Sequence, residues 1–340
     1  MMENDSILEV RNLSTYFPAG RNIKGIKAID DISFSLRKGE ILGIAGESGC
    51  GKTTLVRSIA QLYRPTSGSV YFRGRDLCSL DNRKLSEERR YMQMVFQNPY
   101  SSLDPKMRVD AIIAEPLRIY NRRGLLEHRL TKDEMERCVD ILLDKVNLSR
   151  KCKERYPKEL SGGEAQRVAI ARAIALKPDV ILADEAVSSL DVSIQLQILS
   201  LLKSLKDEMG ISFIFISHDL KSIERIATRV AIMYKGRIVE ICPAVSLDGK
   251  VSHPYTKALL SATYVADPAI EKKRKRIILD GELSTEETNG CPFHPRCKER
   301  TEYCTHHAPK LERVEESHCV SCWMRAGLKD KNKLSSEEWK

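Results

Sequence analysis

The sequence has no long hydrophobic run and no secretory signal pattern. None of its apolar stretches approaches the roughly 18 consecutive apolar residues that a membrane-spanning helix needs. The opening residues, Met-Met-Glu-Asn-Asp, lack a basic segment followed by an apolar one. We therefore expect a cytosolic protein, or one that is peripheral to a membrane.

The sequence also has little net charge for its length. It contains 56 Lys and Arg against 47 Asp and Glu, a net charge of +9 over 340 residues. That excess only weakly favours an anionic ligand or an anionic membrane surface. The length allows one large α/β domain with an appendix, or two modest domains, and we expect the first.

Disulfide bonds are not expected, although the chain has ten cysteines. Five of them are scattered through an apparently cytosolic α/β domain, where disulfides are rare. These are Cys50, Cys78, Cys138, Cys152 and Cys242. The other five fall between residues 291 and 322. Clustering of that kind indicates metal binding rather than oxidation.

Residues 46–53, Gly-Glu-Ser-Gly-Cys-Gly-Lys-Thr, have the form G-x-x-x-x-G-K-[ST] of a phosphate-binding P-loop. They follow the apolar run 41–45 and precede the helical pattern 54–60. A P-loop lies between a strand and a helix in this way, whereas an ordinary glycine-rich turn has no need of such flanks. The glycines let successive backbone N–H groups point at one anion. Lys52 would neutralise the β- and γ-phosphates, and the Thr53 hydroxyl would ligate Mg²⁺.

Hydrophobic patterning predicts further strands and a helical insertion. The strands are expected at residues 6–12, 26–36, 69–72, 92–96, 180–185 and 212–216. Residues 109–158 are instead rich in charge and helical periodicity. Within them, Thr131 and Glu134 form a capping box. An apolar stripe follows it, made of Met135, Val139, Leu142, Leu143 and Val146.

Polar residues stand at the ends of three of these strands. Gln97 can reach Mg²⁺ or an attacking water, although a lone glutamine is usually a surface hydrogen-bonder. Asp184 would hold Mg²⁺, and Glu185 would polarise a water for attack on the γ-phosphate; without a P-loop upstream, such paired acids are often only helix caps. His218 follows the strand 212–216. Ligands bind at the carboxyl ends of parallel strands, so His218 can touch the γ-phosphate.

Two other features have both a structural and a functional interpretation. Residues 160–164, Leu-Ser-Gly-Gly-Glu, open a helix predicted over 165–175. Ser161 and Glu164 fit a capping box, while the double glycine also bares backbone N–H groups for an anion. Tyr16 and Phe17 lie between the first two predicted strands. Such an aromatic could stack on adenine or be a half-buried residue at a strand end.

Together these motifs resemble the nucleotide-binding subunit of an ATP-binding-cassette (ABC) transporter over residues 6–241. In order, they are the P-loop 46–53, a glutamine loop at Gln97, the signature 160–164, the acids Asp184 and Glu185, the loop 188–191 and His218. The resemblance implies an α/β P-loop NTPase cassette with a RecA-like core, an antiparallel β subdomain and a helical subdomain at about 100–160. It also implies two cassettes facing head to tail, with each ATP between the P-loop of one and the signature of the other.

The same resemblance implies the roles of individual residues. Adenine would stack on Phe17, with Tyr16 the next choice. Catalysis would use Glu185 as general base, with Lys52, Gln97 and His218, and Mg²⁺ would be held by Thr53, Gln97 and Asp184. The other nucleotide contacts would be Gly46, Ser48, Gly49, Cys50, Gly51, Lys52, Thr53, Thr54, Ser161, Gly162, Gly163, Glu164 and Asp191. Glu164 stands where Gln is commonest, and Ala186 where Pro usually follows the catalytic acid. Neither departure removes a phosphate contact, so we expect an active site.

The C-terminal part resembles the extension of dipeptide/oligopeptide importer ATPases, on residues 253–260, 281–283 and 291–297. Residues 96–105 resemble the second of the two paralogous ATPases in those importers. The implied organisation is an ABC ATPase domain over 1–245, a linker and helix over 246–290, a small Cys-rich extension over 291–325 and a flexible tail over 326–340. The implied partners are a paralogous ATPase, two transmembrane permease subunits and an extracytoplasmic peptide-binding protein. The expected location is the cytoplasmic face of the membrane.

In this subfamily, the positions of Cys291, Cys297, Cys304 and Cys322 hold a [4Fe–4S] cluster, so the resemblance implies one here. From the chemistry alone, four thiolates could equally hold Zn²⁺. The remaining alternative is that they are free cysteines. Cys319 is an extra thiol that could substitute for Cys322. The basic run 272–276 is expected to be a solvated linker, with contact to anionic lipid as the alternative.

Two rival functions stay open at this point. Importers of nickel or other small solutes use similar ATPases, and nothing in an ATPase subunit touches the cargo. A soluble ABC ATPase acting on DNA or ribosomes is permitted by the basic balance. Those proteins usually carry two cassettes or a long coiled coil, whereas this chain has one cassette and a short helical insertion. We therefore expect no nucleic-acid partner.

Overall fold

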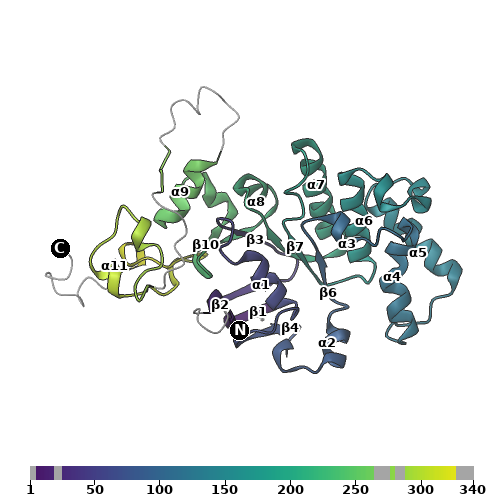
Figure 1. Cartoon of the computed structure of the whole chain (residues 1–340), viewed down its shortest axis with the longest axis horizontal. Helices are drawn as coiled ribbons and strands as arrows, with labels where there is room; N and C mark the ends of the chain where they lie inside the picture. The colour runs from purple at the N-terminus through teal and green to yellow at the C-terminus, as the bar shows by residue number, and fades with distance from the viewer. Residues whose placement is uncertain (1–4, 19–24, 264–275, 280–287, 327–340) are drawn as a thin grey trace.

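The computed structural model describes residues 5–18, 25–263, 276–279 and 288–326 (Figure 1). The strands are β1 (Ser6–Phe17), β2 (Ile26–Arg37), β3 (Ile41–Ala45), β4 (Ser67–Phe72), β5 (Arg75–Asp76), β6 (Met92–Val95), β7 (Val180–Asp184), β8 (Ser212–Ile216), β9 (Arg229–Tyr234), β10 (Arg237–Pro243), β11 (Glu312–Glu315) and β12 (His318–Val320). The predicted strands are confirmed, apart from shifts of a few residues at their ends. No disulfide bond joins any of the ten cysteines, all of which lie among the described residues.

Helices alternate with many of these strands. The α-helices are α1 (Lys52–Ile59), α2 (Asn82–Glu88), α3 (Pro99–Ser102), α4 (Val109–Arg122), α5 (Lys132–Lys145), α6 (Gly162–Ile174), α7 (Val192–Met209), α8 (Leu220–Ile226), α9 (Pro254–Ala262), α11 (Tyr303–His306) and α12 (Trp323–Ala326). The 3₁₀ turns are η1 (Leu77–Ser79), η2 (Arg150–Glu154), η3 (Pro157–Glu159), η4 (Ala244–Asp248) and η5 (His294–Arg296).

The large sheet has the order β11-β12-β10-β9-β3-β8-β7-β6. Strands β9, β3, β8, β7 and β6 are parallel, while β10, β12 and β11 join antiparallel at one edge. Strands β3, β7 and β8 are buried at every residue, as expected when helices cover both faces of a parallel sheet. Alternate residues of β8 enter two separate cores: Phe213 and Phe215 face one, Ile214 and Ile216 the other. The α/β prediction is confirmed.

A second, four-stranded sheet has the order β2-β1-β4-β5 and is antiparallel. Its first strand is longer than predicted, because β1 runs on to Phe17 and so contains both Tyr16 and Phe17. The hydrophobic alternation did not predict the strand beyond residue 12, because the pairing of β1 with β2 shifts register there and Asn12 has a φ of 46°. Such irregularities break the two-residue alternation on which the prediction depends.

The helical insertion follows β6, as predicted. Helices α4, α5 and α6 pack on one another at the end of the molecule opposite the C-terminal segment (Figure 1). The capping box of α5 is confirmed, since Glu134 N donates to Thr131 Oγ1 at 3.3 Å and Thr131 N donates to Glu134 Oε2 at 2.8 Å. The last four residues of the apolar stripe are buried, and Met135 is half-buried.

The C-terminal segment is attached to the large sheet. Strand β12 pairs antiparallel with β10, with Glu240 opposite Val320 and Ile241 opposite Cys319. The fully buried Glu240 carboxylate accepts hydrogen bonds from the N–H groups of Ser252 (2.6 Å) and His253 (3.1 Å), and His318 Nε2 lies 2.6 Å from it. Residues 281–283 and most of the basic run, 272–275, lie outside the described residues.

Candidate active site

The P-loop connects β3 to α1, as the sequence predicted. Its backbone leaves no room for side chains at two glycines. Gly51 has a φ of 106°, and a Cβ there would lie 2.3 Å from the carbonyl oxygen of Ala28. A Cβ on Gly46 would lie 2.3 Å from the carbonyl oxygen of Met233. The loop can therefore curl tightly only because glycine stands at both positions.

Lys52 points back into this loop. Its side chain is 5% exposed, and Nζ donates to the carbonyl oxygens of Gly46 at 2.8 Å and Glu47 at 2.9 Å. The ammonium group is thus held inside the curl of the P-loop. Of the other loop residues, Ser48 and Gly49 are exposed, Thr54 is half-buried and Cys50 is buried; burial raises the pKa of the Cys50 thiol.

Thr53 and Asp184 meet across two elements. Thr53 Oγ1, in the first turn of α1, donates to Asp184 Oδ1 at the end of β7, at 3.0 Å. Burial raises the pKa of the Asp184 carboxyl group, and the hydrogen bond from Thr53 opposes that rise. A hydroxyl and a carboxylate are oxygen ligands of the kind that Mg²⁺ prefers, so this pair fits that ion.

Glu185 lies at the junction of three strand ends. Its Oε2 accepts a hydrogen bond from Gln97 Nε2 at 2.9 Å and lies 3.5 Å from His218 Nδ1. Its backbone has a φ of 48°, a conformation that bulky residues avoid and that often marks a functional position. Three residues predicted from separate strands therefore meet at one carboxylate oxygen. His218 stays largely exposed, so the group faces solvent.

The residues of the signature have local structural roles. Ser161 and Glu164 form the capping box of α6: Glu164 N donates to Ser161 Oγ at 3.3 Å, and Ser161 N donates to Glu164 Oε2 at 2.8 Å. A Cβ on Gly163 would lie 2.6 Å from Ile194 Cγ2. The close packing of α6 against α7 is therefore enough to explain why this position is glycine. Asp191 caps α7 by accepting from Ile194 N at 3.0 Å. Among the described residues, no hydrogen bond or ion pair joins 160–164 to the P-loop.

The two candidate adenine-stacking aromatics differ in their contacts. The Tyr16 hydroxyl donates to Asp30 Oδ1 at 3.0 Å, and Lys27 Nζ lies 5.6 Å from the centre of its ring. Phe17 is half-buried and meets Tyr63 edge-on at 5.4 Å.

The sequence analysis missed two residues that contact Glu47 of the P-loop, Tyr255 and Arg296. Their only signal was the position of both inside motifs of the C-terminal extension.

The four predicted cluster ligands line one pocket, together with His294 and Trp323 among others. They are Cys291, Cys297, Cys304 and Cys322, whereas Cys319 lies in β12 and does not line it. Burial raises the pKa of Cys291 to about 12, and the neighbouring thiols add to that rise. Four thiols around one pocket form a donor set of the kind that zinc sites and iron–sulfur clusters use.

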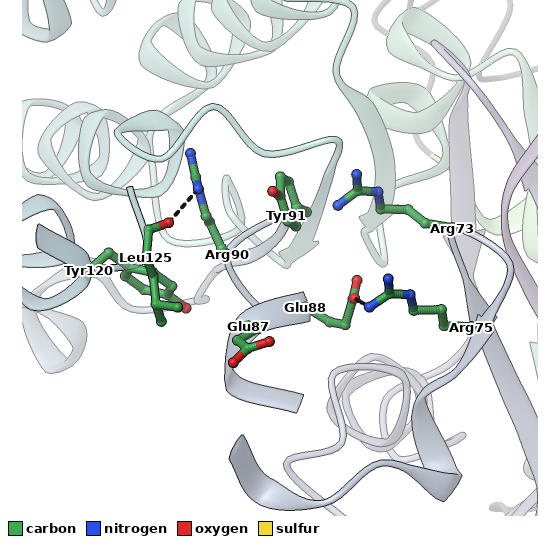
Figure 2. A pocket seen from close by; sticks show the side chains of 8 residues that line it. All are labelled: Arg73, Arg75, Glu87, Glu88, Arg90, Tyr91, Tyr120 and Leu125. Carbon is green, nitrogen blue, oxygen red and sulfur yellow. Dashed lines mark hydrogen bonds and ion pairs between the residues drawn. The ribbon is translucent and has the colours of Figure 1, made fainter. Parts of the chain in front are cut away.

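Two other features are not part of these sites. Ligand atoms of Glu240, Cys242 and His318 lie within 4.8 Å of one another, but both carboxylate oxygens already accept hydrogen bonds. A separate cavity has a volume of about 350 Å³, and none of the predicted site residues lines it. Figure 2 shows the side chains that do. The charged groups of this cavity are largely paired: Arg75 with Glu88 at 2.7 Å, and Arg90 Nη1 with the Leu125 carbonyl oxygen at 2.6 Å.

Among the described residues, no helix combines the length and apolar character that crossing a bilayer requires.

Two family models match the chain. The model described as ABC transporter matches residues 29–188, and the model described as oligopeptide/dipeptide transporter, C-terminal region, matches residues 239–304.

The chain is similar to curated proteins over nearly its whole length. The oligopeptide transport ATP-binding protein AppF of Bacillus subtilis is 42% identical over 94% of this chain and 97% of its own. The dipeptide transport ATP-binding protein DppF of Escherichia coli is 41% identical over 90% of this chain and 91% of its own. Each covers both the cassette and most of the C-terminal part.

Solved structures share the cassette fold. The ATP-binding cassette MJ0796, in a dimeric post-hydrolysis state bound to ADP and Pi, matches with a TM-score of 0.63 and 28% identity. The match covers 70% of this chain and 98% of that one. This likeness agrees with the α/β cassette fold described above. The chain is an ABC-type ATPase, and it belongs to the family of ATP-binding subunits of oligopeptide and dipeptide ABC transporters.

Proposed function

We propose that this chain hydrolyses ATP to drive the uptake of dipeptides or oligopeptides through a membrane complex. The observation that carries the ATPase chemistry is the meeting of Gln97, Glu185 and His218 beside the Thr53–Asp184 pair. The cargo is supported by the names of the relatives and by the match of the C-terminal part to the transporter family.

In the proposed site, the residues divide the work of binding the nucleotide, holding Mg²⁺ and activating water. Lys52 and the N–H groups of residues 46–54 bind the phosphates, and Phe17 stacks on adenine. Thr53, Asp184 and Gln97 would hold Mg²⁺, which supplies charge neutralisation at the phosphate oxygens when bound. Glu185 Oε2 accepts the proton of the attacking water, and the hydrogen bond from Gln97 Nε2 orients that carboxylate. His218 contacts the γ-phosphate from the end of β8.

We further propose that the nucleotide is shared between two cassettes. Ser161, Gly162, Gly163 and Glu164, with Asp191 beyond them, would contact the ATP bound to the P-loop of the partner. The N-terminus of α6 supports this: its cap, Ser161, is exposed and Gly162 is half-buried, and the backbone N–H groups of a helix N-terminus can receive an anion. The dimeric form of the cassette MJ0796 with ADP and Pi supports it as well.

The proposed assembly contains a paralogous ATPase subunit, two transmembrane permeases and an extracytoplasmic peptide-binding protein acting through the permeases. This chain would sit on the cytoplasmic face of the membrane. The proposed division of the chain is the ATPase domain over 1–245, a linker and helix over 246–290, the Cys-rich extension over 291–325 and a tail over 326–340, of which residues 327–340 lie outside the described residues.

The assembly is tested by purifying the tagged chain from gently solubilised membranes of its own cells. We expect two polytopic membrane proteins and a paralogous ATPase to co-purify. Peptide uptake by vesicles containing that complex then tests the cargo, with nickel and sugars as competing solutes. Recovery only from the soluble fraction with nucleic acid or ribosomes would contradict the transport proposal and leave the ATPase chemistry intact.

We also propose that Cys291, Cys297, Cys304 and Cys322 hold a [4Fe–4S] cluster, which would link separate parts of the C-terminal segment. The support is that these four thiols line one pocket and that Cys319 does not line it.

The prediction is that anaerobically purified protein is brown and contains equal amounts of iron and sulfide. Cys291→Ser should lose most of both, because a cluster iron loses its thiolate ligand. Cys319→Ser is the matched control and should keep its iron and colour. Colourless protein that holds zinc instead would overturn the assignment, and equal iron loss in both variants would contradict the choice of ligands.

A further inference from the structure

Glu47, the second residue of the P-loop, is held at three of its groups. Its N–H donates to the Tyr255 hydroxyl oxygen at 2.9 Å, and its carbonyl oxygen accepts from Lys52 Nζ at 2.9 Å. Its carboxylate Oε2 lies 2.9 Å from Arg296 Nη1. Two of the three partners come from beyond the cassette core: Tyr255 from α9 and Arg296 from the cysteine-bearing segment.

Tyr255 is a rigid partner because it is completely buried. Its ring lies 4.7 Å from that of Tyr234 and 5.4 Å from that of Phe293. Burial raises the pKa of its hydroxyl group, which therefore stays protonated. Phe293 is also buried and lies two residues after Cys291 in the sequence. The packed rings of Tyr234, Tyr255 and Phe293 therefore connect the cysteine pocket to the Tyr255 hydroxyl that binds the Glu47 N–H.

Arg296 gives the second connection. Its side chain is 11% exposed and that of Glu47 is 25% exposed, so solvent and salt screen the ion pair less than one on an open surface. Among the described residues, Glu47 is the acid that pairs with Arg296, and the Arg296 guanidinium also lies 6.0 Å from the centre of the Tyr234 ring. The next residue, Cys297, lines the cysteine pocket.

We propose that Arg296 and Tyr255 are positioning residues that set the ATP affinity of the P-loop from the C-terminal segment. The direction of the Glu47 peptide depends on both of them. Lys52 uses the carbonyl oxygen of Glu47, and the loop N–H groups that receive phosphate follow directly after that residue. A shift of Arg296 or Tyr255 therefore reaches the nucleotide without any contact between the C-terminal segment and the nucleotide. The proposal rests on ATP binding at the P-loop but not on the occupant of the cysteine pocket.

The test is to replace Arg296 with Ala and measure ATP hydrolysis by the purified complex containing the full chain. We expect the KM for ATP to rise about 3- to 10-fold, a range typical of coupling between contacting residues. The kcat should change less than about twofold, because Glu185 and its partners are untouched. Arg296→Lys should restore part of the affinity, since it keeps the charge but not the planar fork.

Glu47→Gln should raise the KM as Arg296→Ala does, and the double variant should be no worse than either single one. Tyr255→Phe removes only the hydroxyl oxygen, so it tests the second contact if Arg296→Ala folds poorly.

Arg325→Ala is the matched control. Arg325 pairs with Glu299 inside the same segment, and no ion pair or hydrogen bond in the described part of the chain joins it to the P-loop. An unchanged KM in Arg296→Ala and Tyr255→Phe would overturn the proposal, as would an equal rise in Arg325→Ala. Additive effects of Arg296→Ala and Glu47→Gln would also contradict it.

Discussion

Glu185→Gln is expected to keep ATP binding and to lower the rate of hydrolysis by about 10²- to 10⁴-fold, the usual contribution of a general base. Glutamine has nearly the shape of glutamate but cannot accept a proton from water. The ATP contacts that we propose come from other elements, so the affinity for ATP should stay within about twofold. The contact with Gln97 changes as well, because its Nε2 donates to the oxygen that is altered.

The measurement is phosphate release by the purified complex, together with ATP affinity of the full chain. Glu136→Gln is a suitable control, since that carboxylate is 65% exposed on α5, outside the proposed site, and pairs with Lys153 at 3.5 Å. It should behave like the unmodified protein. Hydrolysis by Glu185→Gln at a rate close to that of the unmodified protein would mean that the base is another group.

Lys52→Met is expected to reduce kcat/KM for ATP by on the order of 10²- to 10³-fold, the scale found when one preorganised donor is removed. Methionine keeps much of the length of the side chain but carries no charge. The phosphates would lose a cation, and the carbonyl oxygens of Gly46 and Glu47 would lose the donor they share.

Equilibrium binding of Mg·ATP and steady-state hydrolysis measure these effects. Urea unfolding separates a damaged loop from a lost phosphate contact, because only the first would lower the free energy of unfolding substantially. Lys84→Met, which removes a largely exposed lysine of α2, is the control and should change neither quantity. An unchanged affinity for ATP in Lys52→Met would refute the role of Lys52.

The sequence by itself determined the elements whose signals are local. The P-loop follows from eight adjacent residues, and the strand over Val180–Asp184 follows from an apolar run that is buried throughout. The capping boxes at Thr131 and Ser161 need only a hydroxyl and a glutamate three residues apart. The grouping of Gln97, Glu185 and His218 was also predictable, because each ends a strand and parallel strands place those ends at one edge of the sheet.

Only the tertiary structure decided the features that depend on distant residues. The packing of Gly163 against Ile194 explains why a side chain is excluded at that position, whereas the sequence around Gly163 indicated only an anion site. Glu47 contacts Tyr255 and Arg296, which lie 208 and 249 residues further along the sequence. The pairing of β12 with β10 likewise joins distant parts of the chain. Periodicity reports which face of an element is buried, but the partner on that face is selected by packing of the whole chain.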